Sequence, residues 1–151
     1  MNNQPAVQDT YPPDFAECYG CGRNNEHGMQ IKTYFVDDET VTDHEPEPFH
    51  KAAGQFAYGG IVASLIDCHS TGSAAIFWMR DRGQTIGVEP TPRFVTARLE
   101  VDYIAPTPLA PLHLVGTPLE IGERKVVVTT ELSAEGVVTA RGQAVLVKIR
   151  I

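Results

Sequence analysis

The sequence predicts an α+β fold in which an antiparallel β-sheet wraps around one long central α-helix. One segment, residues 59–79, is apolar, contains no proline and is rich in small residues. One strand-like segment precedes it, and a run of segments with alternating apolar and polar residues follows it, separated by short turns. A sheet of that kind buries its apolar face by packing against the helix. The chain of 151 residues, with 42% hydrophobic content, has the size of one domain with a modest core.

The part of the chain before the helix is mostly polar. Residues 1–17 are rich in Asn, Gln, Pro and Asp, so we expect a flexible N-terminal arm ahead of a single domain at residues 18–151. Residues 29–36 (MQIKTYFV) alternate well enough to predict a strand. Residues 37–49 contain prolines and glutamates and are expected to be part strand and part loop.

The helix and the strands after it have clearer boundaries in the sequence. The helix is predicted from about Gly59 to Met79, because residues 80–83 (RDRG) form a charged exit with a C-terminal glycine. Residues 94–103 alternate between apolar and polar side chains, which is typical of a strand with one wet or partner-facing side. Three more strands are predicted at residues 112–121, 125–132 and 137–151, with turns at 122–123 and 135–136.

One acidic residue lies inside the apolar helix. Asp67 follows Leu65 and Ile66, and a carboxylate in such surroundings must be paired, solvated by a cavity or used in chemistry. Gly59 and Gly60 open the same helix, where the first backbone N–H groups have no partner within the helix. Those N–H groups can bind a carbonyl oxygen that gains negative charge. A carboxylate together with an oxyanion donor indicates acyl transfer.

The residues around this acid resemble a known family. Tyr58-Gly59-Gly60, followed after six residues by Asp67, is similar to the hallmark of the hotdog-fold acyl-CoA thioesterases of the phenylacetate-pathway and human mitochondrial type, which carry His-Gly-Gly before the acid. Two further segments resemble the same family: CYGCGRNNEHGM at residues 18–29 and TARLEVDYIAP at residues 96–106.

This similarity covers roughly residues 18–150, and it implies a hotdog fold, hydrolysis of acyl-CoA, a dimer, and a position for Thr96 near the acid. The sequence departs from the family pattern at Tyr58, where the family has histidine.

The spacing of the glycines and the acid predicts how the chain assembles. Eight residues separate Gly59 from Asp67, a rise of about 12 Å in a continuous helix, whereas both groups must lie within about 3 to 4 Å of one thioester carbonyl. Two antiparallel helices related by a two-fold axis would bring the glycine end of one against the middle of the other. We therefore expect a homodimer at minimum, with a homotetramer made of two dimers left open.

The expected reaction is the hydrolysis of an acyl thioester to a free acid and coenzyme A. The Gly59 N–H polarises the carbonyl, with the Gly60 N–H as the alternative donor, while Asp67 either attacks the carbonyl or takes a proton from an attacking water. The resemblance adds Thr96 to these catalytic residues. Thr71 shares the helix face of Asp67 and either bonds the carboxylate and positions water, or packs against the sheet.

Three other side chains are candidates for binding the substrate. Ser64 shares the face of Asp67, with the same two alternatives as Thr71. Tyr58 either holds the substrate through its hydroxyl or packs against the start of the helix. Coenzyme A is anionic and needs local basic groups, of which Arg98 is the candidate we select. The other basic candidates are Arg80, Arg82, Arg93, Arg124 and Lys125.

No metal site and no cofactor are predicted. Cys18-x-x-Cys21 lacks the second ligand pair that a zinc site needs, so further ligands would have to come from scattered places, among them His27, His44, His50 and Cys68. We expect the pair to shape the turn before the first strand. Cys68 and His69 point about 100° and 200° away from the acid, so they are not a nucleophile and its base, and we expect them to pack or to lie at the surface.

Charge and hydropathy exclude some classes of partner. The formal net charge of −7 argues against nucleic acid, because phosphate-backbone binding needs a basic face. Residues 1–14 hold no basic residue and no apolar run, so no leader peptide is expected, and no membrane span is expected elsewhere. Three cysteines, an odd number, fit a reducing compartment, and we expect the cytoplasm.

Two other functions compete with thioester hydrolysis. A hydratase or dehydratase on the same fold is disfavoured, because no Asp-x4-His pattern occurs in the sequence. A non-catalytic acyl-CoA-binding protein, acting as a sensor or binding subunit, stays open because of Tyr58.

Overall fold

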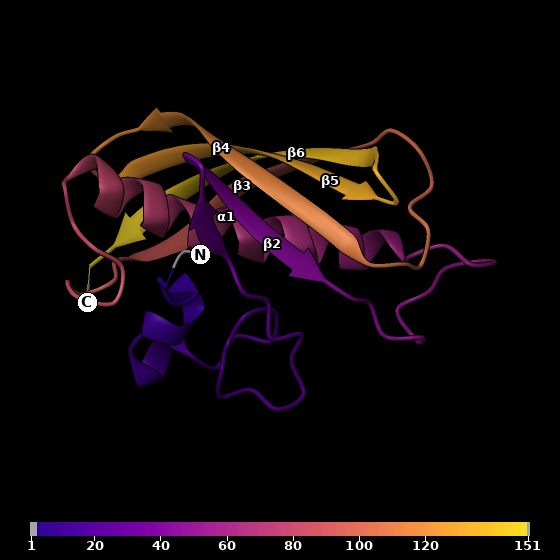
Figure 1. Ribbon diagram of the computed structural model, residues 1–151, viewed down its shortest axis with the longest axis horizontal. Helices are drawn as coiled ribbons and strands as arrows, with labels where there is room; N and C mark the ends of the chain where they lie inside the picture. The colour runs from indigo at the N-terminus through magenta and orange to yellow at the C-terminus, as the bar shows by residue number, and fades with distance from the viewer. Residues whose placement is uncertain (1–2, 151) are drawn as a thin grey trace.

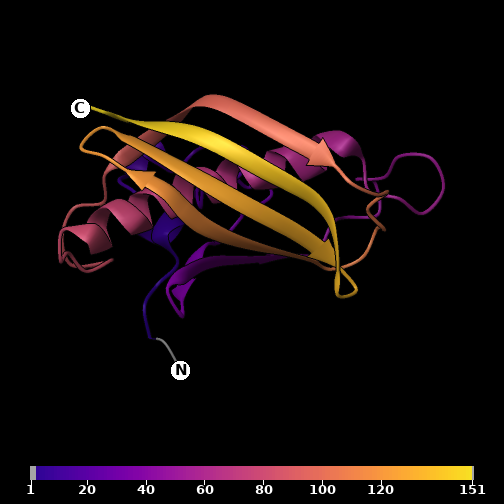
Figure 2. The same ribbon diagram turned by 90° about the horizontal axis from the view of Figure 1, so that it is seen from above.

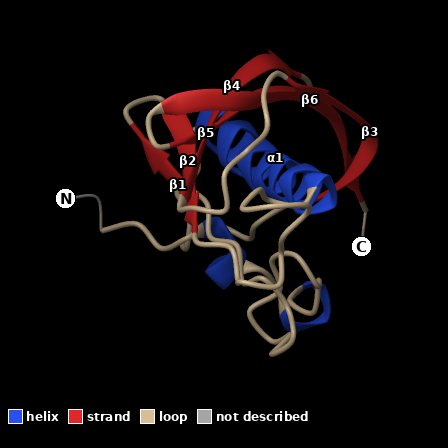
Figure 3. Ribbon diagram, turned by 90° about the vertical axis from the view of Figure 1, so that its right-hand side faces the viewer, coloured by secondary structure: helices blue, strands red, loops and turns tan. Residues whose placement is uncertain are grey.

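The computed structural model describes residues 3–150 and confirms the predicted fold class. Six antiparallel strands form one sheet in the order β1-β2-β4-β5-β6-β3, and the sheet curls around one long helix (Figures 1 and 3). The helix is α1 (Gly59–Asp81). The strands are β1 (Tyr34–Val36), β2 (Glu39–His44), β3 (Arg93–Tyr103), β4 (Leu112–Ile121), β5 (Lys125–Ala134) and β6 (Val137–Ile149).

The elements from the helix onward lie close to their predicted positions. β4 has the predicted limits, β3 starts one residue earlier, and α1 extends two residues further than Met79. β5 and β6 meet at a two-residue turn in which Glu135 and Gly136 have φ angles of 53° and 80°. Two successive left-handed residues match the right-handed twist of a hairpin, which explains why glycine stands at the second position.

The first strand is shorter than the sequence pattern suggests. β1 begins at Tyr34, whereas the alternation begins at Met29. The backbone N–H of Met29 donates to the carbonyl of Tyr19, and that of Ile31 donates to the carbonyl of Gly20. These bonds hold the preceding turn, which contains two cysteines, against the domain.

Helix α1 is buried on most sides because the sheet wraps around it. Leu65, Ile66 and Ile76 are fully buried, and they pack with buried residues of β4, β5 and β6. Among the described residues, α1 is long and apolar enough to cross a membrane by length and composition, but 72% of its most apolar window is buried inside the domain. It is therefore the core helix of the fold.

Residues 3–17 pack on the domain, in contrast to the flexible arm expected at residues 1–17, of which residues 1–2 lie outside the described range. Two short 3-10 helices form there, η1 (Val7–Thr10) and η2 (Pro13–Phe15). Val7 and Gln8 are fully buried, and the Gln8 side chain exchanges hydrogen bonds with Thr33. A Cβ on Gly72 of α1 would lie 2.7 Å from the Gln8 amide nitrogen. The prediction of a flexible arm was wrong because a polar residue in it, Gln8, is buried and hydrogen-bonded to Thr33 inside the fold.

Candidate active site

Asp67 and Thr96 contact each other across the gap between α1 and β3. Asp67 is half-buried, and the Thr96 hydroxyl donates a hydrogen bond of 2.5 Å to Asp67 Oδ1. This bond holds one carboxylate oxygen and leaves the other without a partner among the described residues. Thr96 thus lies where the family resemblance implied.

A β-bulge in β3 turns the Thr96 hydroxyl toward the helix. Successive residues of β6 pair with Thr96 and Arg98, so that Ala97 is an extra residue in the strand. Phe94 and Thr96 face the helix before the bulge, and Leu99 faces it after the bulge. Strict alternation would place the threonine and the leucine on opposite sides of the sheet. The bulge is therefore what brings Thr96 to the acid.

Asp67 opens onto a cleft of about 470 Å³ between α1, β3 and the N-terminal segment. Tyr11, Phe15 and Phe94 contribute apolar walls, and Thr71 lines the cleft beside the acid. A cleft of this volume with few polar groups is typical of a small-molecule site.

The glycine pair begins the helix, as predicted. Tyr58 is the N-cap residue, and its carbonyl accepts hydrogen bonds from the N–H groups of Ile61 and Val62. The N–H groups of Gly59 and Gly60 precede these and are the free donors that every helix N-terminus leaves. They provide the positive end of the helix dipole.

Within one chain, the glycine end and the acid open onto different cavities. Gly59 lines a cavity of about 490 Å³ with Phe56 and Tyr103, in which Asp67 takes no part. The Tyr103 hydroxyl donates to the Gly59 carbonyl at 2.7 Å, a contact that the sequence analysis missed. The sequence contains no signal for this hydrogen bond, because the alternating pattern of residues 94–103 places Tyr103 among the apolar side chains. Within a single chain, Asp67 and the N–H groups of the glycine pair are thus held apart.

Tyr58 is exposed and does not cap the helix through its side chain. Its ring lies over Gly60, where a Cβ would come within 2.3 Å of a ring carbon. The tyrosine in place of the family histidine therefore covers the second glycine with the hydroxyl edge of its ring.

The other candidate side chains do not bond the acid. The Ser64 hydroxyl donates to the carbonyl of Gly60 at 2.8 Å, and the Thr71 hydroxyl donates to the carbonyl of Cys68 at 3.0 Å. Such bonds back to the preceding turn satisfy helical hydroxyls locally. Arg98 is exposed and pairs with Glu100, outside the cleft.

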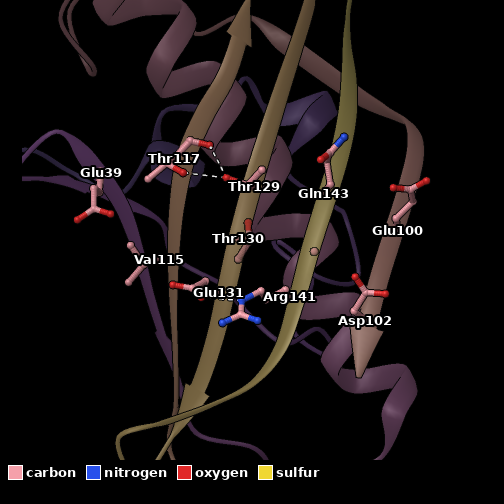
Figure 4. Close-up of a pocket in the computed structure, with 11 residues that line it drawn as sticks. Glu39, Glu100, Asp102, Val115, Thr117, Thr129, Thr130, Glu131, Arg141 and Gln143 are labelled. Atoms are coloured by element: carbon pink, nitrogen blue, oxygen red, sulfur yellow. Dashed lines mark hydrogen bonds and ion pairs between the residues drawn. The ribbon is translucent and has the colours of Figure 1, made fainter. Parts of the chain in front are cut away.

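The outer face of the sheet carries a separate hollow of about 410 Å³, on the side opposite α1 (Figure 4). Glu100, Asp102 and Glu131 line it, and Arg141 pairs with Glu131 at 2.8 Å. Its carboxylates outnumber its single cation, which does not suit an anionic substrate.

The structure brings all three cysteines together. Cys18 and Cys21 lie in the turn before β1, Cys68 lies on α1, and their sulfur atoms are within 4.8 Å of one another. The thiols of Cys21 and Cys68 donate to the Cys18 sulfur and hold the pKa of the Cys18 thiol well below its ordinary value. The pair does shape a turn, since the Gly22 N–H donates to the Cys18 carbonyl at 2.8 Å. From the sequence, we expect any third metal ligand to lie far from Cys18 and Cys21. For Cys68 this expectation is wrong, because its sulfur lies beside both of theirs.

His69 points into the core, away from the cleft. Its Nδ1 pairs with the Thr42 hydroxyl at 2.7 Å, and burial lowers the pKa of His69 to about 3. With so low a pKa the imidazole is too weak a base to accept a proton from Cys68, and it points away from that thiol, as the helix geometry predicted.

Comparisons with known proteins identify the family. The family sequence model of the thioesterase superfamily matches residues 54–140. A thioesterase superfamily protein from Shewanella loihica is 44% identical, with 83% of this chain and 96% of that one covered and a TM-score of 0.68. The fold is shared with a thioesterase from Haemophilus influenzae (13% identity, 81% and 80% covered, TM-score 0.65). It is shared equally with the PaaI protein of the E. coli phenylacetic acid degradation operon (14% identity, 81% of each chain covered, TM-score 0.65). No curated protein sequence matches the chain significantly. The chain belongs to the thioesterase superfamily and has its hotdog fold.

Proposed function

We propose that the protein is an acyl-CoA thioesterase in which the Asp67 carboxylate acts as general base or nucleophile. Family membership supports hydrolysis of an acyl thioester in general. The observation that carries the assignment to this site is the hydrogen bond from Thr96 to Asp67 at the mouth of an apolar-walled cleft. A carboxylate fixed through one oxygen has the other oxygen available for chemistry.

The reaction needs no group beyond those of the protein and water. In one route Asp67 takes a proton from water, the water oxygen bonds to the carbonyl carbon, and the C–S bond breaks as the coenzyme A sulfur leaves and is protonated. In the other route an Asp67 oxygen bonds to the carbonyl carbon and the C–S bond breaks as the coenzyme A thiolate leaves. Water then hydrolyses the acyl anhydride, which releases the free acid, restores the Asp67 carboxylate and supplies the proton that the thiolate takes up. In both, the Gly59 N–H stabilises the oxyanion, with the Gly60 N–H as the alternative donor.

We propose a homodimer as the active unit, with each site formed from the acid of one chain and the glycine end of its partner. β3 lies at one edge of the sheet and pairs only with β6 among the described strands (Figure 2). Val95 and Tyr103 are exposed along this 11-residue strand. A long uncovered edge with apolar side chains favours association with a second copy. A homotetramer would follow if two such dimers pair.

Cys18, Cys21 and Cys68 also bear on the cellular compartment of the protein. All three are free thiols, and free thiols persist in a reducing environment, so the cytoplasm is the compartment we propose.

The decisive experiment compares Asp67→Asn with wild type on a panel of acyl-CoA substrates. The substitution keeps the volume and removes the charge, so kcat should fall by at least about a hundredfold. Asp102→Asn, on the outer face of β3, is the matched control and should retain wild-type activity. Hydrolysis should be followed through the thioester absorbance, because thiol reagents would also label the protein's own cysteines.

The same panel separates the enzyme from a non-catalytic acyl-CoA-binding protein. Wild-type protein that binds the substrates and releases no coenzyme A would be a binding protein. Asp67→Asn that retains most of its kcat, with an unchanged fold, would make the acid structural.

A further inference from the structure

We propose that Cys18, Cys21 and Cys68 form a binding site for a divalent thiophilic metal ion, with Zn²⁺ as the ion that fits best. Their three sulfur atoms lie within 4.8 Å of one another. A zinc ion bonded to sulfurs at about 2.3 Å in a tetrahedral arrangement holds those sulfurs about 3.8 Å apart. The Cys18 and Cys68 sulfurs are 4.0 Å apart, close to that spacing and about twice the length of a disulfide bond.

Two glycines allow the turn that contains Cys18 and Cys21, here called the cysteine turn, to lie in close contact with α1. A Cβ on Gly20 would lie 2.2 Å from the Cys68 sulfur, so that only glycine leaves room for that sulfur beside the turn. A Cβ on Gly22 would lie 2.4 Å from the backbone nitrogen of Cys18. The tight turn therefore places both of its sulfurs on the side that faces Cys68.

The turn is fixed by contacts outside the three sulfurs. The Gln30 side-chain amide donates to the Gly22 carbonyl at 2.9 Å and to the Asn25 carbonyl. The Asn24 N–H donates to the Ala16 carbonyl at 2.9 Å, within the packed N-terminal segment. Ligands held in place before the ion arrives lose little freedom on binding, which raises the affinity.

The number and charge of the ligands favour zinc. Thiolates select zinc or copper(I) among common ions, and zinc accepts three protein ligands with a fourth position left for water. All three cysteines line the cleft onto which Asp67 opens, so the fourth position would face that cleft. A divalent ion balances three thiolates and a nearby carboxylate better than a monovalent ion does.

The test is a titration of reduced, metal-free protein with Co²⁺, followed by Zn²⁺. We expect one equivalent of Co²⁺ to produce thiolate-to-cobalt charge-transfer absorption and the visible bands of a tetrahedral site. Zn²⁺ should then displace the cobalt and raise the thermal unfolding midpoint. Cys18→Ser and Cys68→Ser should each weaken binding by at least about tenfold. His27→Ala is the control, because this exposed histidine near the turn is no part of the sulfur cluster.

Three results would overturn the proposal. One is the absence of charge-transfer absorption in reduced wild-type protein. Another is an unchanged affinity in Cys68→Ser, which would leave the Cys18-x-x-Cys21 pair as an isolated chelator. A third is stoichiometric binding of copper(I) without binding of zinc or cobalt. If circular dichroism shows that Cys68→Ser does not fold, the intensity of the charge-transfer absorption in wild-type protein decides, because it rises with the number of thiolate ligands and would correspond to two thiolates if Cys18 and Cys21 bound the ion alone.

Discussion

If the active site is shared between two chains, two inactive variants should restore activity when they form mixed dimers. The variants are Gly59→Pro, which removes the proposed oxyanion donor, and Asp67→Asn, which removes the proposed base or nucleophile. The two residues are eight positions apart on α1, or about 12 Å along its axis, and they open onto different cavities. Neither chain can therefore bring both groups to one thioester carbonyl.

The structure indicates that proline fits at position 59. Gly59 is the first residue of α1, where proline is favoured because its missing N–H would have no partner within the helix. Tyr58 has φ −62° and ψ 133°, an extended conformation suited to a residue that precedes proline. A Cβ at position 59 meets the Tyr103 ring at 3.6 Å, an ordinary contact. The carbonyl that accepts the Tyr103 hydroxyl is retained.

The expected recovery follows from counting sites. Loss of an oxyanion donor costs about 10²- to 10³-fold in kcat, and loss of a positioned base costs about a hundredfold or more. In a mixed dimer one site carries both lesions and the other carries neither. With random pairing half of the dimers are mixed and each has one good site of two, so activity should approach roughly a quarter of wild type. That exceeds either parent by at least about 25-fold.

The assay is acyl-CoA hydrolysis after the two variants are unfolded and refolded together, with subunit exchange confirmed by native mass spectrometry. The matched control mixes Asp67→Asn with Thr96→Val. These two residues contact each other within one chain, so this mixture should show only the average of its parents. A Gly59→Pro and Asp67→Asn mixture that stays at the level of its parents, despite exchange, would refute the shared site.

Three further predictions test individual contacts. Thr96→Val removes a hydrogen bond to a carboxylate worth about 1.5–3 kcal/mol, so kcat/KM should fall roughly 10- to 150-fold. Thr96→Ser retains the hydroxyl and should keep most of the activity. Steady-state kinetics in which both variants lose the same share of kcat/KM would contradict this. The pKa of His69 is about 3 in the folded chain against about 6.5 when unfolded, so its contribution to stability is complete above about pH 6.5. Below that, it should decline by about 1.4 kcal/mol per pH unit, and urea unfolding of His69→Gln should show a shallower acid dependence than wild type. Gly20→Ala should destabilise by about 1–3 kcal/mol through its clash with the Cys68 sulfur, and adding Cys68→Ala should recover part of that loss; strictly additive effects in a double-mutant cycle would argue against the clash.

The parts of the fold that the sequence predicted are those encoded by long local patterns. The limits of α1 follow from an apolar run between a glycine pair and a charged exit, and β4 follows from regular alternation between turns. The acid and the glycines could be singled out because a carboxylate in an apolar helix and an open helix end are both visible in the sequence.

The parts that could not be predicted depend on tertiary contacts. The bulge at Ala97 shows only in the pairing of β3 with β6, and it reverses the side of the sheet on which Thr96 lies. The approach of Cys68 to the cysteine turn depends on Gly20, whose role emerges only when the turn docks on the helix. The packing of the N-terminal segment rests on buried Gln8, a residue type that usually lies at the surface.

Three consecutive residues of α1 show how one helix serves several purposes in this fold. At 100° per residue, Asp67 faces β3, Cys68 faces the cysteine turn and His69 faces β2, which agrees with their hydrogen bonds to Thr96, Cys18 and Thr42. A helix with one wet face could satisfy such polar residues with water alone, but here Cys68 and His69 are buried, and Asp67 is open only toward the cleft. Each polar side chain must therefore meet a partner on the element that covers it, and the rotation of α1 about its axis is fixed by all three contacts at once. The pairing of acid and threonine, the sulfur cluster and the buried imidazole are in that sense one structural solution, set by where the helix begins at Gly59.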